Sequence, residues 1–163
     1  MPNPRTATLI ILIVLTATIA GAWIFEATGI KPCHLCLMQR WAYYGGIPLA
    51  AAVWLAFSLN PAAARWGLVL LGLMLAASAV FGAYHAGVEW KFWPGPGTCT
   101  GTGELGGGLP SLTDEPVIAC DDAAIRIPTG FLSLAGWNAV ISAALSALAF
   151  SSLWGGRHSA SLR

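Results

Sequence analysis

The sequence predicts an all-α membrane protein, a bundle of four transmembrane helices joined by one short and one long loop on the outer side. Of the 163 residues, 56% are hydrophobic and only 9% are charged, whereas a soluble domain carries about 25% charged residues. Four long apolar stretches contain no Asp, Glu, Lys or Arg. The net charge is +1, so the basic excess of a nucleic-acid-binding protein is missing. We expect a single membrane domain over residues 1–163 and no nucleic-acid partner.

Each apolar stretch has the length of a transmembrane helix. The three shorter ones have 19 residues, and a helix of that length reaches about 28 Å, close to the roughly 30 Å hydrocarbon core of a bilayer. Only helices or closed barrels satisfy their backbone in lipid, and barrel strands would be shorter and alternating. A cleavable signal peptide is less favoured for the first stretch, because its apolar core is longer than usual. The predicted helices are residues 7–25, 41–59, 66–84 and 131–153.

The charges that flank these helices predict their orientation. An even number of spans places both termini on one side, where four arginines and no acid lie within about 22 residues. The other side holds loops 26–40 and 85–130, with four basic residues and all seven acids in about 60 residues. Positive charge is therefore about threefold denser beside the termini, which predicts that the termini face the cytoplasm.

The four cysteines all lie in the two outer loops, at Cys33, Cys36, Cys99 and Cys120. Disulfides persist outside the cytoplasm, and an even count divided between two loops suggests two pairs. A structural zinc site is less favoured, because zinc sites usually use two close pairs and Cys99 is 21 positions from Cys120. We expect no metal site.

The first pair has the spacing of a reactive disulfide, Cys33-His34-Leu35-Cys36. Pro32 precedes it, and proline is favoured in the first turn of a helix. If a helix begins there, its unpaired N–H groups and positive dipole end stabilise a thiolate at Cys36. Arg40 lies one turn further on the same face and would stabilise that thiolate or an anionic ligand, although it could simply extend to the interface. An inert bridge is a further alternative, but so short a ring stabilises little.

The second pair, Cys99 and Cys120, lies in the long loop, which is rich in Gly and Pro. Taken alone, this pair could form a structural disulfide. Beside a reactive pair, it is more typical of a carrier that exchanges disulfides with a partner protein. Turnover then needs an electron acceptor. The sequence has neither a dinucleotide glycine fingerprint nor a Cys-x-x-Cys-His haem motif. A dithiol at a membrane surface without a tight cofactor site favours a lipid-soluble carrier such as a quinone.

Three segments and one cysteine resemble the disulfide bond formation protein B (DsbB) family of bacterial inner-membrane thiol:quinone oxidoreductases. The resemblance runs from about residue 8 to residue 153. Cys120 is matched by order alone, and Gln39 stands where some relatives have an acid. The matching features are Pro-Cys-His-Leu-Cys-Leu-Met-Gln-Arg-Trp at 32–41, Trp-Pro-Gly-Pro-Gly-Thr-Cys at 93–99, Cys120, and Leu-Ser-Leu-Ala-Gly-Trp-Asn at 132–138.

This resemblance implies an electron path through both cysteine pairs. A reduced, DsbA-like oxidant with a thioredoxin fold attacks a Cys99–Cys120 disulfide in the periplasm. It forms a mixed disulfide with Cys99. Electrons then pass to the Cys33–Cys36 disulfide, and Cys36 donates them to ubiquinone or menaquinone, which is not covalently held. Arg40 and His85 are implied to lie near the quinone. The implied location is the bacterial inner membrane.

Two other functions fit the pattern less well. A vitamin K epoxide reductase-like enzyme also uses four helices, two cysteine pairs and a quinone, but there the reactive Cys-x-x-Cys follows the loop pair, and here the order is reversed. A tetraspan scaffold or transporter subunit with structural disulfides would tolerate the loss of Cys33. Against transport, no acid or base lies within a predicted span to carry ions.

Overall fold

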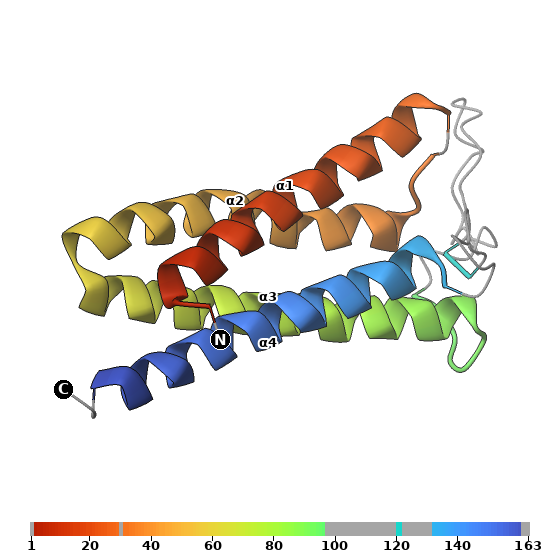
Figure 1. Cartoon of the computed structure of the whole chain (residues 1–163). Coiled ribbons are helices and arrows are strands. Elements are labelled where there is room, and N and C mark those ends of the chain that lie inside the picture. The colour runs from red at the N-terminus through yellow and green to blue at the C-terminus, as the bar shows by residue number, and fades with distance from the viewer. Residues whose placement is uncertain (1, 30, 97–119, 122–131, 161–163) are drawn as a thin grey trace.

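The structure, a computed structural model, describes residues 2–29, 31–96, 120–121 and 132–160, which form a bundle of four helices (Figure 1). The helices are α1 (Pro4–Ala27), α2 (His34–Leu59), α3 (Pro61–Glu89) and α4 (Leu134–Ala160). All four are long and apolar enough to cross a membrane. The predicted all-α bundle of four membrane-spanning helices is therefore confirmed.

The first three helices extend beyond the charge-free stretches that predict them. α2 begins at His34, seven residues before the predicted start, and α3 ends at Glu89, five residues after the predicted end. α4 begins three residues later than predicted. Three of the polar residues in these extensions, Gln39, His85 and Glu89, are buried. Arg40 and His85, which the sequence predicts in the outer loops, therefore lie inside helices.

Short sequence signals determine where α1 and α3 begin. The Asn3 side chain accepts a hydrogen bond from the Thr6 N–H at 2.8 Å, and Asn60 accepts one from the Ala63 N–H at 3.1 Å. In each case proline follows the capping asparagine, where its missing N–H costs nothing. After α1, Gly29 has a φ of +94°, a left-handed conformation that glycine adopts without strain.

The helices alternate in direction along the bundle. The start of α1, the end of α4 and the turn between α2 and α3 lie toward one end, whereas the start of α2 and the last turn of α3 lie at the other (Figure 1). All four helices contribute to one apolar core, while many other large apolar side chains point outward, as expected in lipid. The most buried core residues include Ile11, Leu15, Ala50, Leu68, Leu71, Leu75 and Ala149.

Helices α3 and α4 approach each other closely at two glycines of α3. A Cβ added to Gly82 would lie 2.9 Å from the backbone nitrogen of Ala139. Almost three helical turns earlier in α3, the Gly72 carbonyl accepts a hydrogen bond from the Ser146 hydroxyl at 2.9 Å. Small residues and interhelical hydrogen bonds are what hold helices together in lipid. This contact fixes α3, and with it His85, against the rest of the bundle.

Candidate redox site

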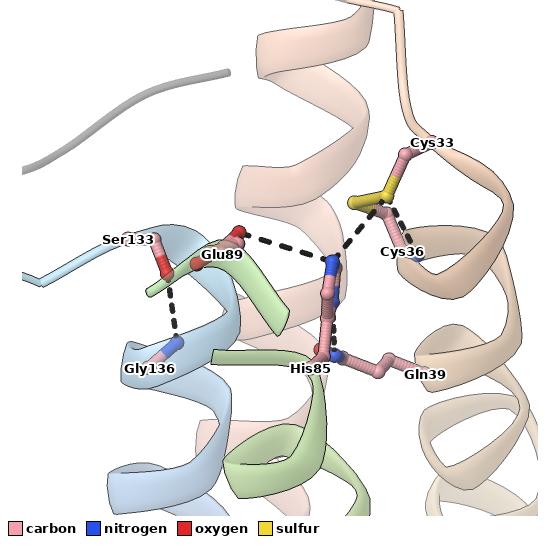
Figure 2. The surroundings of a disulfide bond; sticks show 7 residues. All are labelled: Cys33, Cys36, Gln39, His85, Glu89, Ser133 and Gly136. Atoms are coloured by element: carbon pink, nitrogen blue, oxygen red, sulfur yellow. Dashed lines mark hydrogen bonds and ion pairs between the residues drawn. A yellow bond between two sulfur atoms is a disulfide. The ribbon is translucent and has the colours of Figure 1, made fainter. Parts of the chain in front are cut away.

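A disulfide joins Cys33 and Cys36 at the start of α2 (Figure 2). Cys33 is the N-cap residue of the helix, and its Sγ accepts a hydrogen bond from the Cys36 N–H at 3.2 Å. The helix thus begins at the motif itself. A thiolate formed here by reduction would lie at the positive end of the helix dipole, where negative charge is stabilised.

Cys33 faces the interior of the bundle. It is 6% exposed and forms a buried apolar cluster with Leu35 and the fully buried Cys120, and Phe81 packs against this cluster. Cys120 is itself disulfide-bonded. Cys99 lies outside the described residues. The structure therefore brings one cysteine of the predicted second pair against the first pair.

His85 of α3 contacts Cys33 from inside the bundle (Figure 2). Its Nε2 lies 3.6 Å from Cys33 Sγ and 3.8 Å from Glu89 Oε1, and its Nδ1 lies 2.7 Å from Gln39 Nε2. The main chain of Cys120 also hydrogen-bonds the ring. All of these residues are buried. His85 is therefore a neighbour of both cysteine pairs.

A mostly apolar pocket of about 470 Å³ lies between α1, α2 and α4 and is lined by Cys36. Neither Cys33 nor His85 is among its lining residues. The predicted proximity of His85 to a quinone therefore stays a prediction, whereas its contact with Cys33 is a finding. The pocket has the size and apolar character of a site for a small organic molecule. Its polar or charged lining residues include Glu26, Lys31, Gln39, Arg40, Tyr43 and Asn138.

Arg40 lines this pocket beside Cys36 and is ion-paired. Its Nη1 lies 2.6 Å from Glu26 Oε2, and the side chains are 13% and 45% exposed, respectively. The sequence predicts a fixed positive charge one turn after Cys36 but not its acidic partner on α1. The pair joins α1 to α2 in the lining of the pocket that Cys36 also lines.

Tyr43 and Asn138 add buried polar groups to the pocket lining. The Tyr43 hydroxyl of α2 donates a hydrogen bond to Asn138 Oδ1 of α4, and Ser142 donates to the same oxygen at 3.3 Å. A few polar groups at fixed positions in an apolar pocket orient a bound molecule. This network also ties α2 to α4 across the bundle.

The chain after α3 is anchored next to Cys120. Trp93 stacks on Tyr84 and donates a hydrogen bond from its Nε1 to the Tyr84 carbonyl at 3.0 Å. Lys91 Nζ lies 2.5 Å from Asp121 Oδ2. The hydrogen bond and the charge of Lys91 hold the pKa of Asp121 below its usual range. Because the pair is exposed, its contribution to stability is small.

The chemistry of the cluster is that of a redox site. Single atoms of Cys33, Cys36 and His85 lie within 4.8 Å of one another, a spacing that could suit a metal. However, metals bind thiolates, and here the two sulfurs are bonded to each other. In the sequence, Gln39 stands out only as a departure from the family pattern, and Glu89 does not stand out, although Glu89 lies four positions after His85 and thus on the same helix face.

The comparisons with known proteins agree with this chemistry. A family model described as "Disulfide bond formation protein DsbB" matches residues 4–152, a stretch that includes all four cysteines. No curated protein matches the chain, and no solved structure matches it.

Proposed function

Because this chain belongs to the DsbB family, and is thus a multi-pass membrane oxidoreductase of disulfide-bond formation, we propose that it is a protein-dithiol:quinone oxidoreductase. It reoxidises a periplasmic, DsbA-like oxidant with a thioredoxin fold. It passes the electrons through two cysteine pairs to ubiquinone or menaquinone. It lies in the bacterial inner membrane with both termini in the cytoplasm.

One observation carries this proposal: the two sulfurs of the Cys33–Cys36 disulfide have different surroundings. Cys33 is buried in one cluster with Cys120, whereas Cys36 is only partly buried at the edge of that cluster and also lines the pocket together with Arg40. A disulfide in this position can receive electrons at one sulfur and release them at the other. An inert bridge has no need of either neighbour.

The pocket lined by Cys36 fits the head of a quinone. Its volume is about 470 Å³, within the range of about 300–1,000 Å³ that is typical of small-molecule sites. A bound quinone supplies an acceptor for two electrons and two protons. Arg40 offers N–H donors for carbonyl oxygens, whereas the O–H of Tyr43 is already donated to Asn138. The guanidinium of Arg40 would also stabilise a thiolate at Cys36.

On the donor side, the thiolate of the oxidant attacks a Cys99–Cys120 disulfide and forms a mixed disulfide with Cys99. Cys120 is then released and attacks Cys33, forming a new S–S bond. The electron pair of the Cys33–Cys36 bond leaves on Cys36. The packing of Cys120 with Cys33 supports this order, and each step is a thiolate–disulfide exchange.

The proposed orientation rests on the charge asymmetry and on the shape of the bundle. The start of α2, which carries the disulfide, lies at the end opposite the start of α1 and the end of α4 (Figure 1). Because the termini carry the denser positive charge, they face the cytoplasm and the cysteines face the oxidising periplasm.

The test uses purified full-length protein in detergent, mixed with reduced DsbA and a short-chain ubiquinone analogue. We expect catalytic bleaching of the quinone, loss of turnover in Cys33→Ser and Cys36→Ser, and normal turnover in Arg65→Ala at the opposite end. Absence of turnover in the unmutated protein with both ubiquinone and menaquinone analogues would contradict the proposal. Full activity of Cys33→Ser would instead favour a scaffold with structural disulfides.

A further inference from the structure

The contact between Gln39 and His85 determines which nitrogen of the imidazole ring carries the proton (Figure 2). The amide nitrogen of Gln39 lies 2.7 Å from His85 Nδ1, and both side chains are buried. An amide NH₂ group only donates hydrogen bonds, so Nδ1 is the acceptor. An imidazolium, with N–H groups at both positions, could not accept this bond. The ring is therefore neutral, and its proton lies on the other nitrogen, Nε2.

This second ring nitrogen faces the disulfide (Figure 2). Nε2 of His85 lies 3.6 Å from Cys33 Sγ, a distance at which the large sulfur atom can accept a hydrogen bond, and 3.8 Å from Glu89 Oε1. The main chain of Cys120 hydrogen-bonds the ring as well. Sulfur and carboxyl oxygens are both acceptors. The surroundings of Nε2 thus agree with a nitrogen that carries a proton.

The sulfur of Cys33 therefore faces two N–H donors. The second is the backbone N–H of Cys36, which lies 3.2 Å from Sγ at the start of α2. Cys33 is only 6% exposed, so water contributes little to its solvation. Burying an uncompensated charge costs free energy, whereas hydrogen bonds to a charged atom are about twice as strong as neutral ones. Two donors on this buried sulfur favour a thiolate there over a neutral thiol.

One step of the proposed electron path produces that thiolate. When the second cysteine of the oxidant closes its own disulfide, it leaves Cys99 as a thiolate, which attacks Cys120. The Cys99–Cys120 bond forms again and the Cys33–Cys120 bond breaks. The electron pair of the broken bond stays on Cys33. A thiol whose thiolate is more stable leaves faster in such an exchange.

We infer that Gln39 holds His85 in the tautomer whose Nε2–H stabilises the thiolate of Cys33, an inference that rests on the electron path proposed above. His85 is a catalytic residue of this step because it contacts the reacting sulfur. Gln39 is a positioning residue that acts through it. A carboxylate at position 39 would instead accept a hydrogen bond from Nδ1–H, and the lone pair of Nε2 would then face the sulfur.

The first test determines the tautomer in full-length, quinone-depleted protein. NMR of isotope-labelled histidine distinguishes a protonated from an unprotonated ring nitrogen, and the signals that disappear in His85→Gln belong to His85. We expect a proton on Nε2 and none on Nδ1 in the unmutated chain, and the reverse in Gln39→Glu. A proton on Nδ1 of the unmutated chain would overturn the inference, whatever the electron path is.

The second test measures the equilibrium between the Cys33–Cys36 disulfide and its dithiol in thiol redox buffers, by alkylation and peptide mapping. Gln39→Met has a side chain of similar length without an N–H donor. It should shift the equilibrium toward the disulfide by about tenfold, which corresponds to about 30 mV. In His85→Gln, whose amide N–H can replace Nε2–H, adding Gln39→Met should change the equilibrium by less than about twofold. The control Ser146→Ala, which removes a buried hydrogen bond between α3 and α4, should leave it unchanged.

Two results of the second test would also overturn the inference. One is an unchanged equilibrium in Gln39→Met. The other is an equally large shift when Gln39→Met is added to His85→Gln, because Gln39 would then act without His85. A failure of the proposed function looks different: the tautomer and the equilibrium would respond as expected, but reduced DsbA and a quinone would give no turnover in the unmutated protein.

Discussion

Arg40 donates a hydrogen bond to Glu26 beside the pocket that Cys36 lines, with 2.6 Å between Nη1 and Oε2. The arginine is therefore held by α1. This contact disagrees with the alternative interpretation, in which the Arg40 side chain simply extends to the membrane interface. A guanidinium fixed in the pocket that Cys36 lines keeps its positive charge where a thiolate or a polar acceptor would need it.

Replacing Arg40 by alanine should weaken use of the quinone more than exchange with the protein partner. The loss of a charged hydrogen-bond donor predicts a rise in the KM for a ubiquinone analogue of about tenfold or more. The KM for reduced DsbA should stay within about twofold, because on this account Arg40 takes no part in exchange with the partner. Steady-state kinetics with each substrate varied in turn measure both, with Arg65→Ala as the matched control. Equal effects on both substrates would remove Arg40 from the acceptor site.

Replacing Glu26 by glutamine should have the opposite and smaller effect. The carboxylate competes with a bound molecule for the Arg40 guanidinium, and a partly exposed pair of this kind contributes at most about 1 kcal/mol. The KM for the quinone should therefore fall by at most about fivefold. A clear rise in KM would show instead that Glu26 is needed to hold Arg40 in place.

The close approach of α3 and α4 predicts a steric effect at Gly82. A methyl group there would meet the backbone nitrogen of Ala139 at 2.9 Å, and a backbone atom cannot easily move away. Gly82→Ala should lower the free energy of unfolding by about 1–3 kcal/mol, measured by denaturant titration in mixed micelles. The control is Gly21→Ala in α1, where an added Cβ has nothing within 4 Å. Equal stability of the two variants would mean that the α3–α4 contact is not tight.

The sequence predicts the bundle well because the spans are long, apolar and free of charge. It places the helix ends less well, because a charge-free stretch stops at the first charged residue whereas a helix continues. Arg40 and His85 are the clearest cases. The charge-free stretches place both in the outer loops, and both lie in helices whose ends extend beyond the apolar stretch.

The surroundings of the disulfide could be predicted only in part. Local spacing is enough to indicate that Cys33 and Cys36 form a reactive pair at a helix start. The contacts of His85 with Gln39 and Cys33 join positions 46 and 52 residues apart, and no local pattern encodes such contacts. By sequence alone Glu89 is one of the charges of the long loop, and only its burial next to His85 distinguishes it from a surface acid.

The central claim is that Cys33 receives electrons from Cys120 while Cys36 passes them on at the pocket. The most direct measurement maps the disulfides of purified Cys36→Ser protein by mass spectrometry of its peptides. Without Cys36, the free Cys33 thiol should attack the loop disulfide and give a Cys33–Cys120 bond with Cys99 free. A bond between Cys33 and Cys99, or a Cys33 thiol that stays free beside an intact Cys99–Cys120 disulfide, would contradict the claim.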